Sequence, residues 1–260
     1  IPRVAECITQ AHAALVPAQA GWAVVDAPRH THSRRWLYRP EHVALDPFGE
    51  RTVRAMMHPG YQNPKYSGPS GPVDTGLTVL SIQASDGRPL CVLANYSMHY
   101  YGHTGSGFSA DYFGEFAGYI EQKLADEKSP GPRPLAIMSQ GTSGDLHWMD
   151  YSQPQRKDYT RTQYARELGD FALVALTKIS YRRDVDLAMA ETRLTIGRRQ
   201  PSEARLRWAK ELNAQRGDRR PKDLPEVYAE QAVWLAEHPE AELVLQAVRV
   251  GELGLTASGG

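Results

Sequence analysis

The chain has 260 residues, enough to bury the core of one large domain or of two small ones. Lysine plus arginine and aspartate plus glutamate each number 30, so the formal net charge is zero. This balance provides no electrostatic reason to expect nucleic acid or an anionic membrane surface as a partner. No apolar run approaches the ~18–20 residues that a membrane-spanning helix needs, so we expect no transmembrane segment. Composition thus indicates a globular protein and excludes no enzyme class.

The first hundred residues alternate between helix, strand and loop patterns. Apolar residues at helical spacing from Val4 to Leu15 predict a helix, and Gly21–Val25 is typical of a short strand. The stretch from about 47 to 72 is rich in Pro, Gly, Tyr and Asn without a sustained period. We interpret it as a long ordered loop, a kind of segment that tends to be functional. An Asp-Gly pair then separates two β-branched runs and predicts a hairpin of Leu77–Gln83 with Leu90–Tyr96.

The remainder of the chain mixes amphipathic helices with short strands. Ser109 is expected to cap a helix whose apolar face runs from Phe113 to Leu124. Further elements are predicted from periodicity: strands at Leu135–Met138, Val185–Ile196, Leu243–Val250 and Leu253–Ala257, and helices around Leu168–Ile179, Glu203–Gln215 and Pro225–Glu237. We therefore predict a single α/β layered domain over residues 1–260, with a mixed β-sheet flanked by helices.

Two histidine pairs are candidate metal ligands. His30 and His32 at i and i+2 on an extended segment would point the same way and reach one metal ion, the alternative being an exposed polar loop. His99 leaves the end of a predicted buried strand, where rigid backbone would hold its imidazole as a zinc donor. His103 would share a helical face with His99, but Gly102 argues against a helix there. The alternative for this pair is one hydrogen-bonded core histidine and one exposed histidine.

A loop of small residues follows the strand at Leu135–Met138. Small residues at the end of a strand let the backbone approach a ligand and present N–H groups to an anion. Asp145 and His147 would orient or ionise a nucleophile or water, and Ser143 joins them as a catalytic candidate. The alternative is a tight structural turn with a capping aspartate. The loop matches neither the phosphate-binding Walker pattern nor the Gly-x-Ser-x-Gly nucleophile elbow.

Several segments in the same order resemble the catalytic domain of neutral/alkaline (non-lysosomal) ceramidases, and more closely their bacterial ceramidase-like relatives. The resemblance covers nearly the whole chain and is carried by Asn63-Pro64, Gly71–Asp74, Leu80–Leu90, Ala94–Tyr100, Ser109–Gly114, Gly141–Asp145 and Gln246–Gly254. It implies that the 260 residues are an internal part of a longer catalytic domain.

The resemblance also implies the chemistry. If the resemblance holds, His99 is a zinc ligand and zinc is the cofactor. Asp111 is then expected beside the site, and the Gly144-Asp145 loop is expected to face the reacting carbonyl. Gly144, Asp111 and His103 are then candidates for binding the substrate. The expected reaction is hydrolysis of a linear amide of a lipid-like N-acyl substrate, releasing a fatty acid and an amine. A secreted or periplasmic location is the tendency of the family.

The chain departs from the family pattern at identifiable positions. His147, followed by Trp148, stands where the family has a serine followed by proline. The family's zinc segment precedes the first helix, whereas His30–Ser33 follows it, so its likeness to that segment is interpreted as a coincidence. The glutamate and tyrosine ligands are expected outside this chain. Two alternatives therefore remain: a metal hydrolase of another ester or amide, and a non-catalytic binding protein that retains the fold.

Overall fold

The computed structural model describes residues 2–102, 107–125 and 132–258. It contains two compact units. The first comprises Ile1–Arg39 and Ala55–Val185, and the second comprises Pro40–Arg54 and Asp186–Gly260. The assignment of one domain to residues 1–260 stays a prediction, because compact units of this size can belong to one domain.

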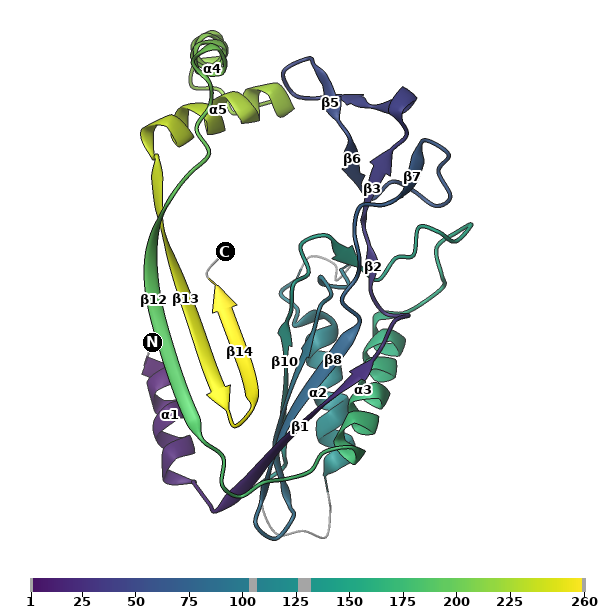
Figure 1. Cartoon of the computed structure of the whole chain (residues 1–260), viewed down its shortest axis with the longest axis vertical. Helices are drawn as coiled ribbons and strands as arrows, with labels where there is room; N and C mark the ends of the chain where they lie inside the picture. The colour runs from purple at the N-terminus through teal and green to yellow at the C-terminus, as the bar shows by residue number, and fades with distance from the viewer. Residues whose placement is uncertain (1, 103–106, 126–131, 259–260) are drawn as a thin grey trace. The chain divides into compact units, whose positions relative to one another are not determined.

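A four-stranded sheet organises the first unit (Figure 1). Its strands, in spatial order, are β1 (Ala18–Asp26), β8 (Gly76–Ala84), β9 (Pro89–Tyr96) and β10 (Leu135–Gln140). The first three are antiparallel, and β10 runs parallel to β9. β8 and β9 form the predicted hairpin, whose turn includes Gly87 at a positive φ of 91°. The prediction of a mixed sheet flanked by helices is confirmed.

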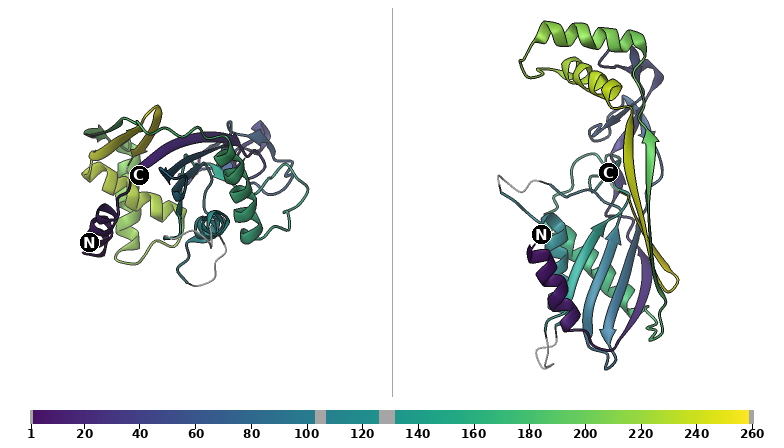
Figure 2. Two further views of the ribbon diagram at one scale, coloured as in Figure 1. Left: turned by 90° about the horizontal axis from the view of Figure 1, so that it is seen from below. Right: turned by 90° about the vertical axis from the view of Figure 1, so that its left-hand side faces the viewer.

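Two helices pack against this sheet and build the core (Figure 2). They are α2 (Asp111–Leu124) and α3 (Arg161–Thr177), and a capping box between Thr160 and Gln163 starts the second. The core is formed by fully buried residues of both layers, including Leu77, Val79, Val92, Phe116, Ile120 and Leu168. The helix predicted at the start of the chain is α1 (Pro2–Ala13), and none of its residues is buried.

Short strands at one end of the first unit correct the interpretation of residues 47–72 as a loop. β6 (Ala55–Met57) and β7 (Tyr66–Pro69) pair with opposite sides of β3 (Arg35–Tyr38). Strands of three or four residues are too short to show an alternating pattern in the sequence, so only their pairing reveals them. A further two-stranded ladder joins β2 (His32–Ser33) to β11 (Leu146–His147).

The second unit contains a three-stranded antiparallel sheet and a helix pair. The sheet follows the order β12 (Leu187–Gly197), β13 (Glu240–Val250) and β14 (Leu253–Ser258). The other elements of this unit are the helices α4 (Glu203–Arg216), α5 (Leu224–Glu237) and η1 (Pro40–His42), and the strands β4 (Ala44–Leu45) and β5 (Arg51–Val53). Small buried residues of α4 and α5 pack together, namely Ala209, Ala229 and Ala232. Among the described residues, no helix is long and apolar enough to cross a bilayer.

Candidate active site

The two segments predicted to carry chemistry meet at one edge of the main sheet. Because β9 and β10 are parallel neighbours, their carboxyl ends lie together, and ligands commonly bind at such an edge. The backbone N–H of Gly141 donates to the carbonyl of Tyr96 at 3.0 Å. A Cβ at Gly141 would lie 2.5 Å from Ser97 Oγ, so only glycine permits this approach. The sheet thus brings the segment ending in His99 next to the loop that contains residues 143–147.

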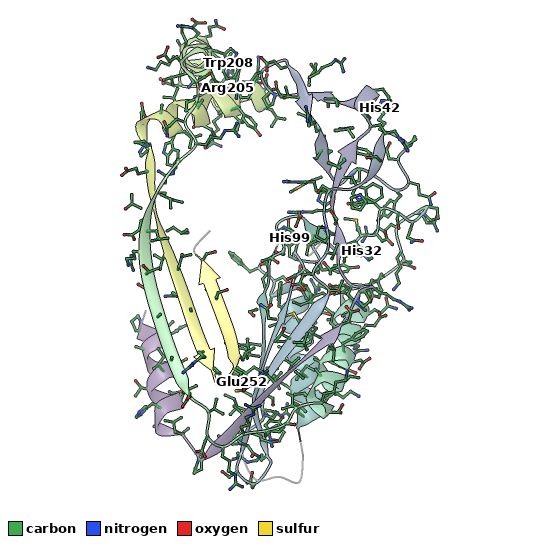
Figure 3. All side chains as sticks on the ribbon, viewed as in Figure 1. His32, His42, His99, Arg205, Trp208 and Glu252 are labelled. Atoms are coloured by element: carbon green, nitrogen blue, oxygen red, sulfur yellow. The ribbon has the colours of Figure 1, made fainter. Side chains whose placement is uncertain are left out.

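His99 is half-buried just beyond the end of β9, toward the upper end of the sheet in Figure 3. Its ring centroid lies 4.2 Å from that of Tyr100. Burial lowers the pKa of His99, and the nearby charges of Arg34 and His58 lower it further. Its Nδ1 is buried without a hydrogen-bond partner among the described residues. A neutral imidazole with an unpartnered buried nitrogen is suited to a metal ion or to a donor on a substrate.

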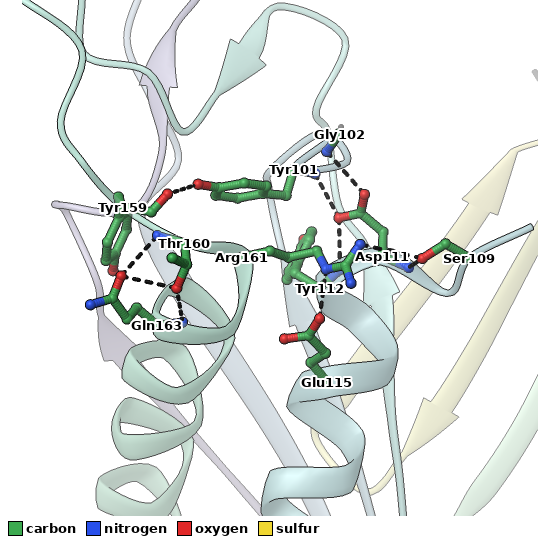
Figure 4. A network of polar contacts seen from close by, with 10 residues as sticks. All are labelled: Tyr101, Gly102, Ser109, Asp111, Tyr112, Glu115, Tyr159, Thr160, Arg161 and Gln163. Atoms are coloured by element: carbon green, nitrogen blue, oxygen red, sulfur yellow. Dashed lines mark hydrogen bonds and ion pairs between the residues drawn. The ribbon is translucent and has the colours of Figure 1, made fainter. Parts of the chain in front are cut away.

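Hydrogen bonds to Asp111 stabilise the loop that follows His99 (Figure 4). Its carboxylate accepts hydrogen bonds from the backbone N–H groups of Tyr101, Gly102 and Tyr112 at 2.7–2.9 Å. Asp111 itself adopts a positive φ of 52°, an uncommon conformation for a residue with a side chain. Ser109 was expected to be the N-cap of α2, and the structure corrects this prediction. Ala110 occupies the N-cap position of α2, and the Ser109 hydroxyl accepts from the Asp111 N–H at 2.9 Å.

Arg34 holds the loop that precedes β11. The carbonyl of Gly144 accepts from its guanidinium at 2.8 Å, and the carbonyl of Asp145 accepts from its backbone N–H at 2.8 Å. The Asp145 side chain is half-buried, lines a pocket of about 400 Å³ together with Asp74 and has no hydrogen-bond partner in the described part of the chain. Its carboxylate oxygens are thus available to accept a hydrogen bond from a ligand.

Ser143 is buried, and its hydroxyl accepts from Gln140 Nε2 at 2.6 Å. Within the described ranges no histidine or carboxylate forms a hydrogen bond with this hydroxyl. A serine nucleophile needs such a neighbouring base, so the structure supplies no activation for Ser143.

His147 lies on β11, opposite His32 of β2. It is buried, and its pKa is lowered to about 3, first by burial and then by the charges of His58 and Arg34. Its Nδ1 accepts from the backbone N–H of Met149 at 3.3 Å. A backbone N–H can only donate, so the neutral imidazole carries its proton on Nε2. His147 therefore presents an N–H donor rather than a basic lone pair.

The sequence did not predict two residues near His147, namely His58 and Tyr151. His58 lies with its ring centroid 5.4 Å from that of His147 in an edge-on arrangement. Its Nδ1 is 2.5 Å from the hydroxyl of Tyr151. His58 has a positive φ of 56° and follows the short strand β6. It occurs in the segment interpreted as a loop, where no periodic pattern marks a single histidine as functional.

The His30 and His32 pair does not form the metal site considered from its spacing. His30 Nε2 lies 3.0 Å from Glu167 of α3, and its ring contacts those of Tyr164 and Phe171. His32 instead occupies the ladder position opposite His147. Across residues 2–102, 107–125 and 132–258, no group of three or more His, Cys, Asp or Glu side chains is arranged to hold a metal ion. His103 lies outside the described residues.

Comparisons with known proteins address the fold. No protein-family model and no curated protein matches the chain. Solved structures do match, among them the neutral ceramidase from Pseudomonas aeruginosa, at 14% identity and a TM-score of 0.50, and a ceramidase complexed with C2, at 16% identity and a TM-score of 0.51. They cover 96% and 95% of this chain, which spans only 41% and 42% of theirs. The resemblance recognised in the sequence is thereby supported in three dimensions, and the chain has the fold of part of a neutral ceramidase.

Proposed function

We propose that this chain carries part of the active site of a hydrolase that cleaves linear N-acyl amides and releases a fatty acid and an amine. The observation that carries the proposal is the meeting of His99 with the 143–147 loop at the carboxyl edge of β9 and β10. The ceramidase-like fold supports the same reaction class. Lipid-like N-acyl compounds are the proposed substrates, and ceramide is one member of that group.

The side chains suggest a division of roles. Asp145, with its unpartnered carboxylate, accepts a proton from the water that attacks the acyl carbon. His147 offers its Nε2–H to the carbonyl oxygen, where negative charge develops. The new C–O bond forms, the C–N bond breaks, and the proton passes to the leaving amine. Ser143 supports the loop, and Gly144 and Asp111 shape the space beside the substrate.

Zinc is the proposed cofactor, with His99 as one ligand. The unpartnered Nδ1 of His99 is compatible with this role, but the described residues do not assemble a complete site. The remaining ligands would come from other parts of the protein. When bound, zinc would polarise the acyl carbonyl and lower the pKa of a bound water to about 7.

A second candidate is hydrolysis of another ester or amide, and it is favoured by His147 at the position where the family has serine. A location outside the cytoplasm accompanies the first proposal and rests on the family resemblance. Cell fractionation tests the location directly, since recovery only in the cytoplasm would contradict it.

The test is performed on the longest natural chain that contains these residues. Zinc per chain is measured by elemental analysis, and hydrolysis is measured with a panel of N-acyl amides and esters. We expect about one zinc, lost in His99→Ala with the far-ultraviolet circular dichroism unchanged. Unchanged zinc content in this variant would refute the ligand assignment. No zinc and no hydrolysis in the folded parent would favour the non-catalytic alternative.

Asp145→Asn tests the base separately. It keeps the size of the side chain and removes the proton acceptor, so we expect turnover to fall at least ~100-fold, the typical contribution of a general base. The midpoint of thermal unfolding should change little. Turnover equal to that of the parent would remove Asp145 from the mechanism.

A further inference from the structure

His58 and Arg34 form a group of hydrogen-bond donors beside the proposed catalytic residues. The backbone N–H of His58 donates to the carbonyl of Arg34 at 2.8 Å, which ties β6 to the segment after β2. The ring of His58 packs edge-on against His147. The charge of Arg34 acts on His58, His99 and His147, as its effect on the pKa of all three shows.

The hydrogen bond to Tyr151 determines which nitrogen of His58 is a donor. Burial raises the pKa of Tyr151 to about 12, so its hydroxyl keeps its proton. That hydroxyl faces two acceptors, His58 Nδ1 at 2.5 Å and the thioether of Met149 at 3.8 Å. Because an imidazole nitrogen is a much stronger acceptor than a thioether, we assign the phenol proton to the contact with Nδ1. This assignment puts the proton of the neutral His58 ring on Nε2.

Arg34 retains unused donors in the same place. Its Nε and one Nη2 hydrogen are directed to the carbonyl of Gly144, which leaves the Nη1 side of the guanidinium without a partner among the described residues. No carboxylate forms an ion pair with Arg34 in the described part of the chain. A guanidinium and an imidazole N–H are both donors from which carboxylates accept hydrogen bonds, and the backbone contact between His58 and Arg34 keeps the two residues together.

We propose that Arg34 and His58 bind a carboxylate, either that of an acidic amide substrate such as an N-acyl amino acid or that of the fatty acid released by cleavage. This inference rests on the proposed hydrolysis, because it assigns the substrate class of the same site. The carboxylate has two possible sources: the amine half of an N-acyl amino acid and the fatty acid released by cleavage. Ceramide, whose amine half is a neutral amino-alcohol, offers only the second.

Binding is measured by calorimetry on the longest natural chain with three probes of the same acyl length. These are N-lauroylglycine, its neutral analogue N-lauroylglycinamide, and laurate. We expect N-lauroylglycine to bind at least ~10-fold more tightly than the neutral analogue, the difference that one charge-assisted hydrogen bond typically provides. Comparable binding by laurate would assign the site to the acid product, whereas weak binding by laurate would assign it to the amine half. Equal affinity for all three probes would overturn the inference.

His58→Asn removes the proposed donor with little other change. Asparagine tolerates a positive φ, and its amide occupies the position of Nδ1 and can keep the contact with Tyr151, so only Nε2 is lost. We expect it to abolish the preference for the carboxylate probe without weakening the neutral one. His42→Asn, at an exposed histidine of the second unit, is the matched control and should bind all three probes as the parent does.

The two proposals fail in different ways. If the parent hydrolyses no amide but His58→Asn loses the preference for the carboxylate probe, the binding site is supported and the proposed reaction is contradicted. Hydrolysis of N-acyl amides without a preference for the carboxylate, in the parent and the variant alike, would retain the reaction and overturn this inference.

Discussion

Strands β8 and β12 have similar apolar sequences but very different surroundings. In β8, buried residues alternate with half-buried ones along most of the strand, and Leu77 and Val79 are fully buried. All eleven residues of β12 are exposed within the described structure. The helices α2 and α3 of the first unit cover one face of its sheet, whereas the buried residues of α4 and α5 pack against each other. An apolar strand pattern therefore identifies the element, and the partner element determines how much it contributes to stability.

The strongest test of this comparison is a pair of truncations. Phe116 is fully buried in α2, and Phe116→Ala should lower the free energy of unfolding by about 3–5 kcal/mol through lost burial and the cavity left behind. Leu187 in β12 is 75% exposed, and Leu187→Ala should change it by less than about 0.5 kcal/mol. Urea unfolding curves measure both. Similar losses in the two variants would contradict the difference between the units.

Two helical glycines sharpen the comparison inside the first unit. A Cβ at Gly169 of α3 would lie 2.4 Å from Cδ1 of Tyr119, whose hydroxyl is held by Asp170 at 2.6 Å. Gly169→Ala should therefore destabilise by about 1–3 kcal/mol through overpacking. At Gly118 of α2 nothing lies within 4 Å of the added Cβ. Gly118→Ala should stabilise by about 1 kcal/mol through helix propensity alone. Stabilisation by both substitutions in thermal melts would show that α2 and α3 do not pack closely at Gly169.

The smallest expected effect concerns acid stability of the second unit. The hydrogen bond from Arg219 lowers the pKa of Glu226 from 4.5 to about 2. A carboxyl whose pKa is lower in the folded state stabilises the fold above pH 4.5, and this contribution is lost as the pH falls toward 2. Glu226→Gln should therefore flatten the dependence of the unfolding midpoint on pH between these values. A parent and a variant with parallel curves would mean that this ion pair contributes nothing.

Local signals explain what could be predicted from the sequence. The Asp86-Gly87 turn and the helical spacing in α3, α4 and α5 are properties of neighbouring residues, and these elements lie close to where they were expected. The parallel pairing of β10 with β9 depends on a crossover through α2 and had no local signal. His58 was missed for the same reason, since only pairing of β6 with β3 brings it to His147. The roles of the seven candidate site residues remain predictions.

The carboxylate of Asp111 has a consequence for hydrogen exchange. Tyr101 and Gly102 belong to no helix or strand, yet their amide protons are bound to this one side chain. Amides in such a segment normally exchange rapidly with solvent, whereas these two should exchange only when the carboxylate releases them. Their deuterium uptake would then report, at two neighbouring positions, how often the backbone beside His99 opens.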